Sequence, residues 1–254
     1  MSLELKNIRL DFSGLKWAVR DISFSVANGE VFVLAGGIGS GKSSILRAIA
    51  GLEQIASGDI LLNNNSILNT PIKEKNIFLM QENLALFKAK TVFKNLAHSL
   101  KIKKLPKEAI ETQVLEVAKK VQLELLLNKK IKHLSPLEKI KVNLARLSFR
   151  QIDLILIDDP FIFLNEQDAK TALDLIKNLA SEYNCPLVYT CLDPNHAVHL
   201  NSKTAIIKEG KILQLDTIQN IIKAPTNNFV KAYINSQTAL GNPSGEICTA
   251  DRAV

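Results

Sequence analysis

Residues 36–43 match the pattern G-x-x-x-x-G-K-[ST] and constrain the fold more than any other part of the chain. An apolar, strand-like run at 31–35 precedes them, and a helical pattern at 44–50 follows and ends at Gly51. Glycines allow successive backbone N–H groups to turn around a polyphosphate, and the helix N-terminus adds the positive end of its dipole. A chance match rarely has both this strand and this helix, so the segment predicts nucleotide binding.

Two side chains of this segment are predicted to carry its chemistry. Lys42 is expected to reach the β- and γ-phosphates of ATP, and the Ser43 hydroxyl to complete the coordination of a Mg²⁺ ion. ATP and Mg²⁺ are therefore the predicted cofactors. The predicted nucleotide-binding residues of the segment are Gly36, Gly37, Gly39, Ser40, Gly41, Lys42, Ser43 and Ser44.

Composition narrows the class of protein. The chain has 254 residues, 46% of them hydrophobic, enough for a large core in one domain or one domain plus a subdomain. Along the sequence the lysines behind the net charge of +7 are scattered, without an arginine-rich stripe, so no nucleic-acid partner is expected. There is no apolar run of about 18 residues and no metal-ligand spacing among the three cysteines. We therefore expect a cytosolic protein; if it works at a membrane, another subunit must carry it there.

Strand-like and helical segments alternate along most of the chain. Strands are predicted near 3–10, 22–26, 59–62, 77–80, 154–157 and 187–190, with a hairpin at 205–213. Between about 88 and 150 the pattern turns helical, with a long charged stretch at 108–127 and a helix after Ser135, which predicts a helical subdomain. The alternation predicts a mainly parallel α/β core. We expect one domain over residues 1–237 and a flexible tail at 238–254.

Several further stretches resemble the nucleotide-binding subunit of ABC transporters, over nearly the whole chain. The chain is most similar to the ATPases of carbohydrate importers of the maltose-transporter type. The resemblance implies a P-loop NTPase fold of the α/β class: a RecA-like parallel-sheet core with an antiparallel β subdomain and a helical subdomain. The stretches that carry it are Ala50-Gly51-Leu52-Glu53, Ser57-Gly58, Gln81-Glu82-Asn83-Leu84-Ala85-Leu86-Phe87, Thr91-Val92, Asn95-Leu96 and residues 225–230.

The resemblance also assigns roles outside the glycine-rich segment. Phe12 falls where the family stacks an aromatic ring on adenine, with Trp17 as the alternative. Gln81 falls at the Q-loop, which contacts Mg²⁺ or the attacking water. Asp158 ends an apolar strand and is expected to hold Mg²⁺ through its water shell. Asp159 stands in place of the family's catalytic glutamate and is the predicted catalytic residue, together with Gln81.

Four positions depart from the family pattern, and all concern steps after ATP binding. Asp159 is one methylene shorter than glutamate, and a base must come within about 2.6–3.2 Å of the proton that it takes, so hydrolysis is expected to be slow or impaired. Leu192 replaces the switch histidine and has no hydrogen-bonding group in its side chain. His196 is either a substitute or an ordinary surface histidine. Asn165 replaces the aspartate of the D-loop.

The fourth departure is the signature L-S-G-G-Q, which reads Leu134-Ser135-Pro136-Leu137-Glu138. Pro136 has no N–H group, and Leu137 is bulky where close backbone approach is wanted. Ser135 and Glu138 instead predict a capping box at a helix start. The family pairs head to tail, each site combining one chain's P-loop with its partner's signature. This chain departs from the family pattern both in the catalytic residues near its own P-loop and in the signature that it offers to a partner. Even a heterodimer would therefore contain no fully intact site.

These patterns predict an ATP-binding subunit of a membrane transporter, by resemblance an importer, that couples ATP binding and slow hydrolysis to transport. The implied partners are integral membrane permease subunits and either a second copy of the chain or a second ABC subunit. The implied location is the cytoplasmic face of the cell membrane. A non-hydrolysing adaptor or regulatory module of the same fold is the alternative. A soluble ATPase acting on nucleic acid fits less well, because such proteins usually carry two cassettes in one chain.

Overall fold

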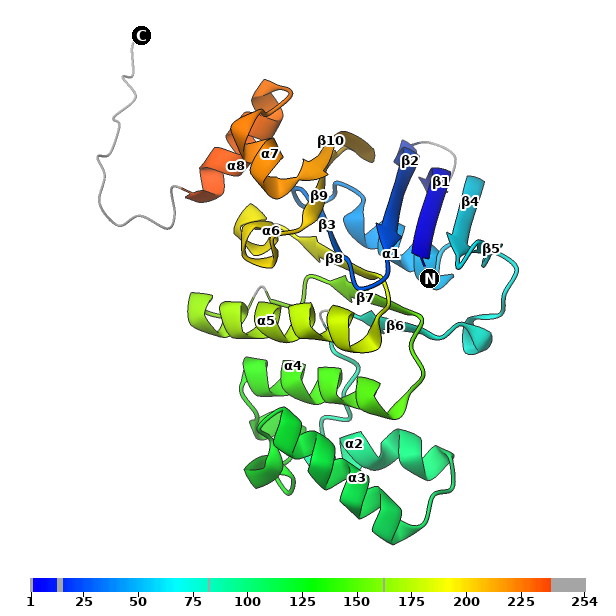
Figure 1. Cartoon of the computed structure of the whole chain (residues 1–254), viewed down its shortest axis with the longest axis vertical. Coiled ribbons are helices and arrows are strands. Elements are labelled where there is room, and N and C mark those ends of the chain that lie inside the picture. The colour runs from blue at the N-terminus through cyan, green and yellow to red at the C-terminus, as the bar shows by residue number, and fades with distance from the viewer. Residues whose placement is uncertain (1, 13–15, 82, 162, 239–254) are drawn as a thin grey trace, which may run out of the picture.

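The fold is described from a computed structural model that covers residues 2–12, 16–81, 83–161 and 163–238 (Figure 1). Its centre is a six-stranded sheet in the order β10-β9-β3-β8-β7-β6. All neighbouring strands run parallel except β10, which pairs antiparallel with β9. The strands are β3 (Val31–Ala35), β6 (Ile77–Met80), β7 (Leu154–Asp158), β8 (Leu187–Cys191), β9 (Lys203–Lys208) and β10 (Lys211–Thr217).

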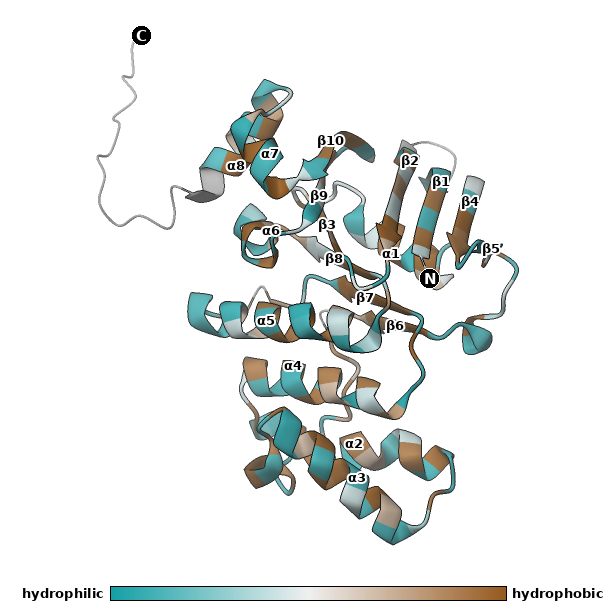
Figure 2. Cartoon of the chain, in the orientation of Figure 1, coloured by the Kyte–Doolittle hydropathy of each residue, from teal (hydrophilic) through white to brown (hydrophobic). Residues whose placement is uncertain are grey.

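The central sheet is parallel because its strands are apolar on both faces. Alternate residues of β3 enter different cores: Phe32 and Leu34 lie in one, and Val33 and Ala35 lie in the other. The first core contains α1 (Lys42–Ala50) and the second contains α5 (Glu166–Tyr183). In Figure 2 the hydrophobic colour is clearest on β6 and β7, whereas β8 is paler.

A second, antiparallel sheet lies beside α1 and has the order β2-β1-β4-β5. Its inward-facing apolar residues share the core of α1, so the two sheets enclose this helix. The P-loop NTPase arrangement of a parallel core with an antiparallel β part is therefore confirmed. The strands are β1 (Ser2–Phe12), β2 (Lys16–Ala27), β4 (Ser57–Leu62) and β5 (Asn65–Ser66).

Helices replace strands between β6 and β7, and they build a third core of their own at the lower end of Figure 1. They are α2 (Val92–Ile102), α3 (Lys107–Lys120) and α4 (Pro136–Ala145), with short 3₁₀ turns at Glu124–Leu126, Ile131–His133 and Arg146–Phe149. The helix predicted at 108–127 is shorter than expected. It ends at Lys120 because Gln122 takes a left-handed conformation with φ 59°.

The last part of the described chain packs in the same core as α5, on one face of the central sheet. After β8 the chain forms α6 (Pro194–Leu200), α7 (Ile218–Lys223) and α8 (Asn228–Thr238). Elsewhere, a 3₁₀ turn at Ile72–Glu74 precedes β6. Residues 239–254, most of the predicted tail, lie outside the described residues. Among the residues that the structure describes, no helix is long and apolar enough to cross a membrane.

Asn95 fixes the segment that leads into α2. It is 1% exposed. Its Oδ1 accepts from the Phe87 N–H (2.9 Å), and its Nδ2 donates to the carbonyls of Thr91 (2.9 Å) and Phe87 (3.3 Å). Thr91 caps the helix through its own hydroxyl, which accepts from the Lys94 N–H. One buried amide and one cap therefore hold the loop at 87–91 in a single conformation.

Replacing Asn95 with alanine is expected to lower the free energy of unfolding by about 1–3 kcal/mol, because it leaves the partly buried Phe87 N–H without its partner and removes one of the two hydrogen bonds to each of the Phe87 and Thr91 carbonyls. Urea unfolding followed by circular dichroism would measure the change. Asn128→Ala, at an exposed asparagine of the same region, is the control and should shift stability by less than about 0.5 kcal/mol. Equal effects of the two substitutions would contradict the role given to Asn95.

Candidate nucleotide-binding site

The glycine-rich loop joins the end of β3 to the start of α1 and passes close to neighbouring backbone. A Cβ on Gly36 would lie 2.3 Å from the Ile207 carbonyl oxygen of β9. A Cβ on Gly41 would lie 2.7 Å from the Ala18 carbonyl oxygen of β2, and Gly41 has φ 101°. Only glycine fits at these two positions. The loop is thereby held against both sheets, with the N-terminus of α1 at its end.

Lys42 lies inside this loop. Its Nζ donates to the carbonyl oxygens of Gly36 (2.6 Å) and Gly37 (2.7 Å) and to Ser40 Oγ (3.1 Å). The residue is 7% exposed, and burial lowers the pKa of its ammonium group. Oxygen atoms of the loop itself thus position the ammonium group of Lys42. It lies at the N-terminal end of α1, where the helix dipole favours an anion.

Asp158 joins three elements at the carboxyl edge of the central sheet. Its Oδ1 accepts from Ser43 Oγ of α1 (2.9 Å) and from Thr190 Oγ1 of β8 (2.9 Å). The predicted proximity of Ser43 and Asp158 is therefore present, although they are 115 residues apart. Thr190 was missed by the sequence reasoning, because its position opposite Asp158 follows from the β7–β8 register, which requires the strand order.

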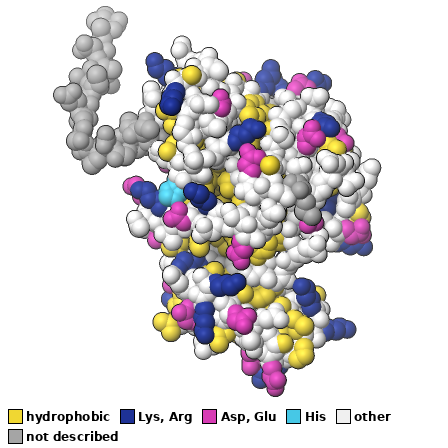
Figure 3. All heavy atoms as spheres, viewed as in Figure 1, with side chains coloured by type: hydrophobic (Ala, Val, Ile, Leu, Met, Phe, Trp, Pro, Cys, Tyr) yellow, Lys and Arg dark blue, Asp and Glu magenta, His cyan; other side chains and the backbone are white. Residues whose placement is uncertain are grey.

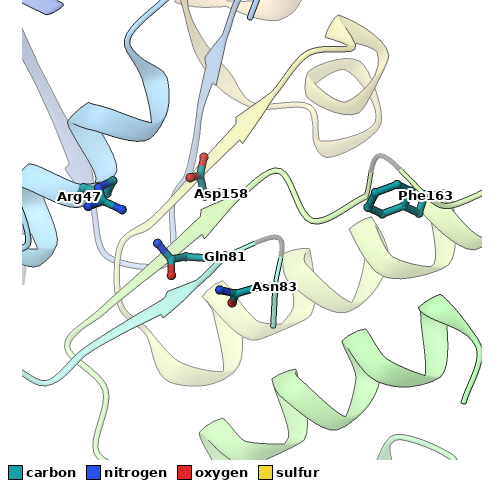
Figure 4. A pocket seen from close by; sticks show the side chains of 5 residues that line it. All are labelled: Arg47, Gln81, Asn83, Asp158 and Phe163. Carbon is teal, nitrogen blue, oxygen red and sulfur yellow. The ribbon is translucent and has the colours of Figure 1, made fainter. Parts of the chain in front are cut away.

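A pocket of about 640 Å³ opens beside Asp158 (Figure 4). In the close-up, Gln81 and Asp158 lie on neighbouring strand ends, Arg47 extends from α1, and Phe163 lies on the loop before α5. Gln81 follows β6, whose pairing with β7 places it next to Asp158. Arg47 was not predicted; its Nε bonds Glu53 at 2.5 Å. The lining residues are Arg47, Gln81, Asn83, Asp158 and Phe163.

The oxygen donors at this pocket suit magnesium. A hydroxyl (Ser43), a carboxylate (Asp158) and an amide (Gln81) are hard ligands, and Mg²⁺ is usually bound by one or two carboxylates plus substrate phosphates and water. Within the described residues, no group of three His, Cys, Asp or Glu side chains forms an all-protein metal site. The donor set therefore fits an ion that reaches the protein together with a polyphosphate.

Asp159 is held by the backbone at the end of the neighbouring strand. Its Oδ2 accepts from the N–H of Leu192 at 3.0 Å, and the residue has φ 28°. Burial raises the pKa of its carboxyl group to about 6, although the Leu192 N–H and Lys42 act in the opposite direction. The Leu192 carbonyl accepts from Tyr233 Oη of α8 at 2.6 Å. One carboxylate oxygen of the predicted catalytic residue is thus engaged within the fold.

His196 is half-buried and is hydrogen-bonded to a neighbouring tyrosine. Its Nδ1 lies 2.6 Å from Tyr189 Oη, and its ring contacts Phe161 edge-on at 6.1 Å between centroids. Burial lowers the pKa of its imidazole. His196 is therefore half-buried against Tyr189 and Phe161, and its role as a substitute for the switch histidine stays a prediction.

The altered signature is a helix start. Ser135 Oγ accepts from the Glu138 N–H (3.2 Å), and Glu138 Oε2 accepts from the Ser135 N–H (2.7 Å), with Pro136 in the first turn of α4. The predicted capping box is confirmed. Asn165 likewise caps α5 by accepting from the Asp168 N–H at 2.8 Å. The side chain of Phe12, the predicted adenine contact, lies outside the described residues, as does that of Trp17.

The α4 helix is also attached to the loop that follows Gln81. Asn143, 5% exposed, donates from Nδ2 to the Leu84 carbonyl, and Arg146 donates to the Ala85 carbonyl at 3.0 Å. Leu84 and Ala85 both have positive φ, at 52° and 42°. The hydrogen bonds hold in place a backbone conformation that non-glycine residues rarely adopt.

The fold and this loop define the class of P-loop nucleotide-binding proteins, and comparison with known proteins is more specific. The family model "ABC transporter" matches residues 19–162. The sn-glycerol-3-phosphate import ATP-binding protein UgpC of Brucella abortus biovar 1 is 32% identical over 98% of this chain and 72% of its own length. The spermidine/putrescine import ATP-binding protein PotA of Haemophilus influenzae is 28% identical over 97% of this chain and 70% of its own length.

Solved structures agree on the fold. A nucleotide-free ATP-binding cassette from an ABC transporter superposes with a TM-score of 0.78 at 21% identity, covering 92% of this chain and 98% of that one. A cassette in a dimeric post-hydrolysis state, bound to ADP and Pi, gives a TM-score of 0.73 at 23% identity, covering 85% and 98%. The chain belongs to the ABC transporter family and is one of its ATP-binding cassettes, an ABC-type ATPase.

The raised pKa of Asp159 predicts a pH-dependent effect on stability. A carboxyl group whose folded pKa exceeds its unfolded value of 3.8 destabilises the fold once it is charged, so the penalty is largest above about pH 6 and disappears below about pH 4. Asp159→Asn should therefore stabilise the protein at pH 8 by up to about 3 kcal/mol, from roughly two pKa units at 1.36 kcal/mol each.

The measurement is urea unfolding with a chelator present, at several pH values from about 4 to 8. The gain should shrink as the pH falls from about 6 to 4. Asp11→Asn, at an exposed aspartate of β1, is the control and should show no such trend. A gain for Asp159→Asn that is the same at every pH would show that burial does not raise this pKa.

Proposed function

We propose that this chain is the ATP-binding subunit of an importer complex and that it binds Mg·ATP well but hydrolyses it slowly. The curated relatives PotA and UgpC are import ATP-binding proteins by name, and the chain aligns with them over nearly its whole length. The observation that carries the proposal is the contrast between a complete phosphate-binding loop and an altered set of groups around it.

The proposed phosphate site uses Lys42, Ser43 and the backbone of residues 36–44, and the proposed Mg²⁺ ligands are Ser43, Gln81 and Asp158. Two positions that only glycine can occupy, 36 and 41, support the phosphate site, as does the buried ammonium group of Lys42. The Ser43–Asp158 contact supports the metal site. A bound Mg²⁺ would stabilise charge on the terminal phosphates, and this chain would contribute the positions of the oxygen donors.

Slow hydrolysis is supported by the surroundings of the proposed base. Asp159 is one methylene shorter than glutamate, and one of its carboxylate oxygens accepts from the Leu192 N–H at 3.0 Å, which ties the proposed base to the backbone. Leu192 offers no side-chain donor at the position of the switch histidine. At the start of α4, the Glu138 N–H is capped by Ser135 Oγ, and Pro136 has no N–H group. At Asp159, at Leu192 and at the start of α4, a group that would contact the reacting phosphate or water in the family is therefore either absent or bonded within the fold.

The same features favour a second candidate function, a non-hydrolysing adaptor or regulatory subunit of a transporter. In both, the chain works with integral membrane permease subunits at the cytoplasmic face of the membrane, and it pairs with a second copy or a second ABC subunit. The cassette spans residues 1–237, with a helical subdomain at about 88–150 that is supported by its separate hydrophobic core. Thr238, the first residue of the expected tail, instead ends α8, and residues 239–254 lie outside the described residues.

Lys42→Ala is expected to weaken Mg·ATP binding about 10- to 100-fold, because hydrogen bonds to charged groups contribute about 1.5–3 kcal/mol. Isothermal titration calorimetry on the full chain would measure the affinity. Lys177→Ala, at an exposed lysine of α5, is the control and should leave it unchanged. Equal affinities of Lys42→Ala and the native chain would remove the glycine-rich loop from the account.

Restoring the consensus residues separates the two candidate functions. One set is Asp159→Glu with Leu192→His; the other is Pro136→Gly, Leu137→Gly and Glu138→Gln. Because the two sets contact one transition state across a head-to-tail pair, each alone should raise the steady-state ATPase rate little, and both together by much more than the product of the single effects. Full recovery from the first set alone would mean that the signature departure is neutral. A combination that binds ATP and stays inactive would favour the adaptor.

A further inference from the structure

The positive charge of this chain is concentrated in two segments of the helical region. Residues 83–107 and 125–137 contain ten lysines, no arginine and no acidic residue. All ten lysines are exposed. The positive charge of these ten lysines is larger than the net charge of the whole chain, +7. The rest of the chain has 22 basic and 25 acidic side chains, so it is slightly acidic. The lysines that look scattered along the sequence therefore account for the entire basic excess.

The fold brings parts of these two segments together. Their backbones are linked by hydrogen bonds from Val92 N to Lys129 O (3.0 Å), from Ile131 N to Lys90 O (3.1 Å) and from Lys132 N to Lys88 O (3.3 Å). A bridge between Thr91 and Lys130 lies in the same place. We call the resulting surface the lysine patch; its members are Lys88, Lys90, Lys94, Lys129, Lys130 and Lys132.

The lysine patch is built on rigid backbone, and its charges are not neutralised locally. The buried amide of Asn95 holds the loop that carries Lys88 and Lys90. Among the residues that the structure describes, no ion pair involves a patch lysine. Lys94 even lies in the first turn of α2, where a cation opposes the helix dipole and no acidic residue compensates. A local excess of positive charge without ion-pair partners in the fold favours contact with an external anionic partner.

The residue types favour a charged lipid surface as that partner. Arginine offers a planar fork for specific pairing and is enriched at protein interfaces, whereas lysine is depleted there and acts as a mobile point charge. Clusters of lysine bind anionic headgroups through this undirected attraction. Phe87 adds an apolar ring inside the patch: it is 37% exposed, and Lys90 Nζ lies 4.3 Å from its centroid. Figure 3 shows basic and hydrophobic side chains together over this end of the molecule.

We propose that the lysine patch contacts the anionic phospholipid headgroups of the membrane that holds the permease. The proposal rests on the proposed function only in that the latter places the chain at a membrane. The patch belongs to the helical region and shares no residue with the nucleotide site, so lipid contact and ATP binding are separable. The attraction is electrostatic and weakens with salt, since it acts over about one Debye length.

Vesicle flotation of the full chain tests the proposal. Phosphatidylcholine vesicles with about one-third phosphatidylglycerol should bind the native chain at low salt, and pure phosphatidylcholine vesicles should not. The patch variant replaces Lys88, Lys90, Lys94, Lys129, Lys130 and Lys132 with Gln. The control variant replaces six exposed lysines elsewhere with Gln and so has the same net charge: Lys6, Lys73, Lys119, Lys177, Lys223 and Lys231.

The patch variant should lose at least about 100-fold in affinity for the anionic vesicles, and the control variant less than about threefold. Equal losses would show that net charge alone governs binding, and absence of binding by the native chain would overturn the proposal. Tighter binding to soluble polyglutamate or duplex DNA than to vesicles would assign the patch to another partner. Calorimetry with Mg·ATP on the same proteins should give equal affinities, so failure of the proposed function would be seen separately.

Discussion

One carboxylate oxygen organises the site. Asp158 Oδ1 accepts hydrogen bonds from Ser43 of α1 and Thr190 of β8, so three elements meet at a single atom at the carboxyl edge of the sheet. The arrangement depends on a parallel sheet, because only parallel strands bring the ends of β3, β7 and β8 to one edge. That sheet depends in turn on apolar residues on both of its faces, which supply the two cores around it.

The groups that would act on a bound phosphate are instead used inside the fold. The N–H of Leu192 binds Asp159 and its carbonyl binds Tyr233, and both contacts satisfy partly buried polar groups. At the exposed start of α4, Ser135 caps the Glu138 N–H, and Pro136 has no N–H group. The chain therefore combines a glycine-rich loop that holds Lys42 with a carboxylate and a helix start that are hydrogen-bonded within the fold, and the proposal of slow hydrolysis rests on this contrast.

Much of this was predictable from the sequence, and the exceptions have physical reasons. The glycine-rich loop, the strand before Asp158 and the capping box at Ser135 are local patterns, and each is present as expected. Thr190 depends on strand order, and the orientation of His196 depends on how α6 packs; neither can be read from neighbouring residues. The lysines looked dispersed because the contact between 88–92 and 129–132 joins segments about forty residues apart.

The central claim, that this chain holds ATP without rapid turnover, is tested most directly by a single-turnover experiment. The full chain, in excess over radiolabelled ATP and Mg²⁺, would be followed for both bound nucleotide and released phosphate. The account predicts that ATP binds fully and that phosphate forms far more slowly than the roughly 10 s⁻¹ that is typical of enzymes. Phosphate release at or above that rate in the chain alone would contradict it.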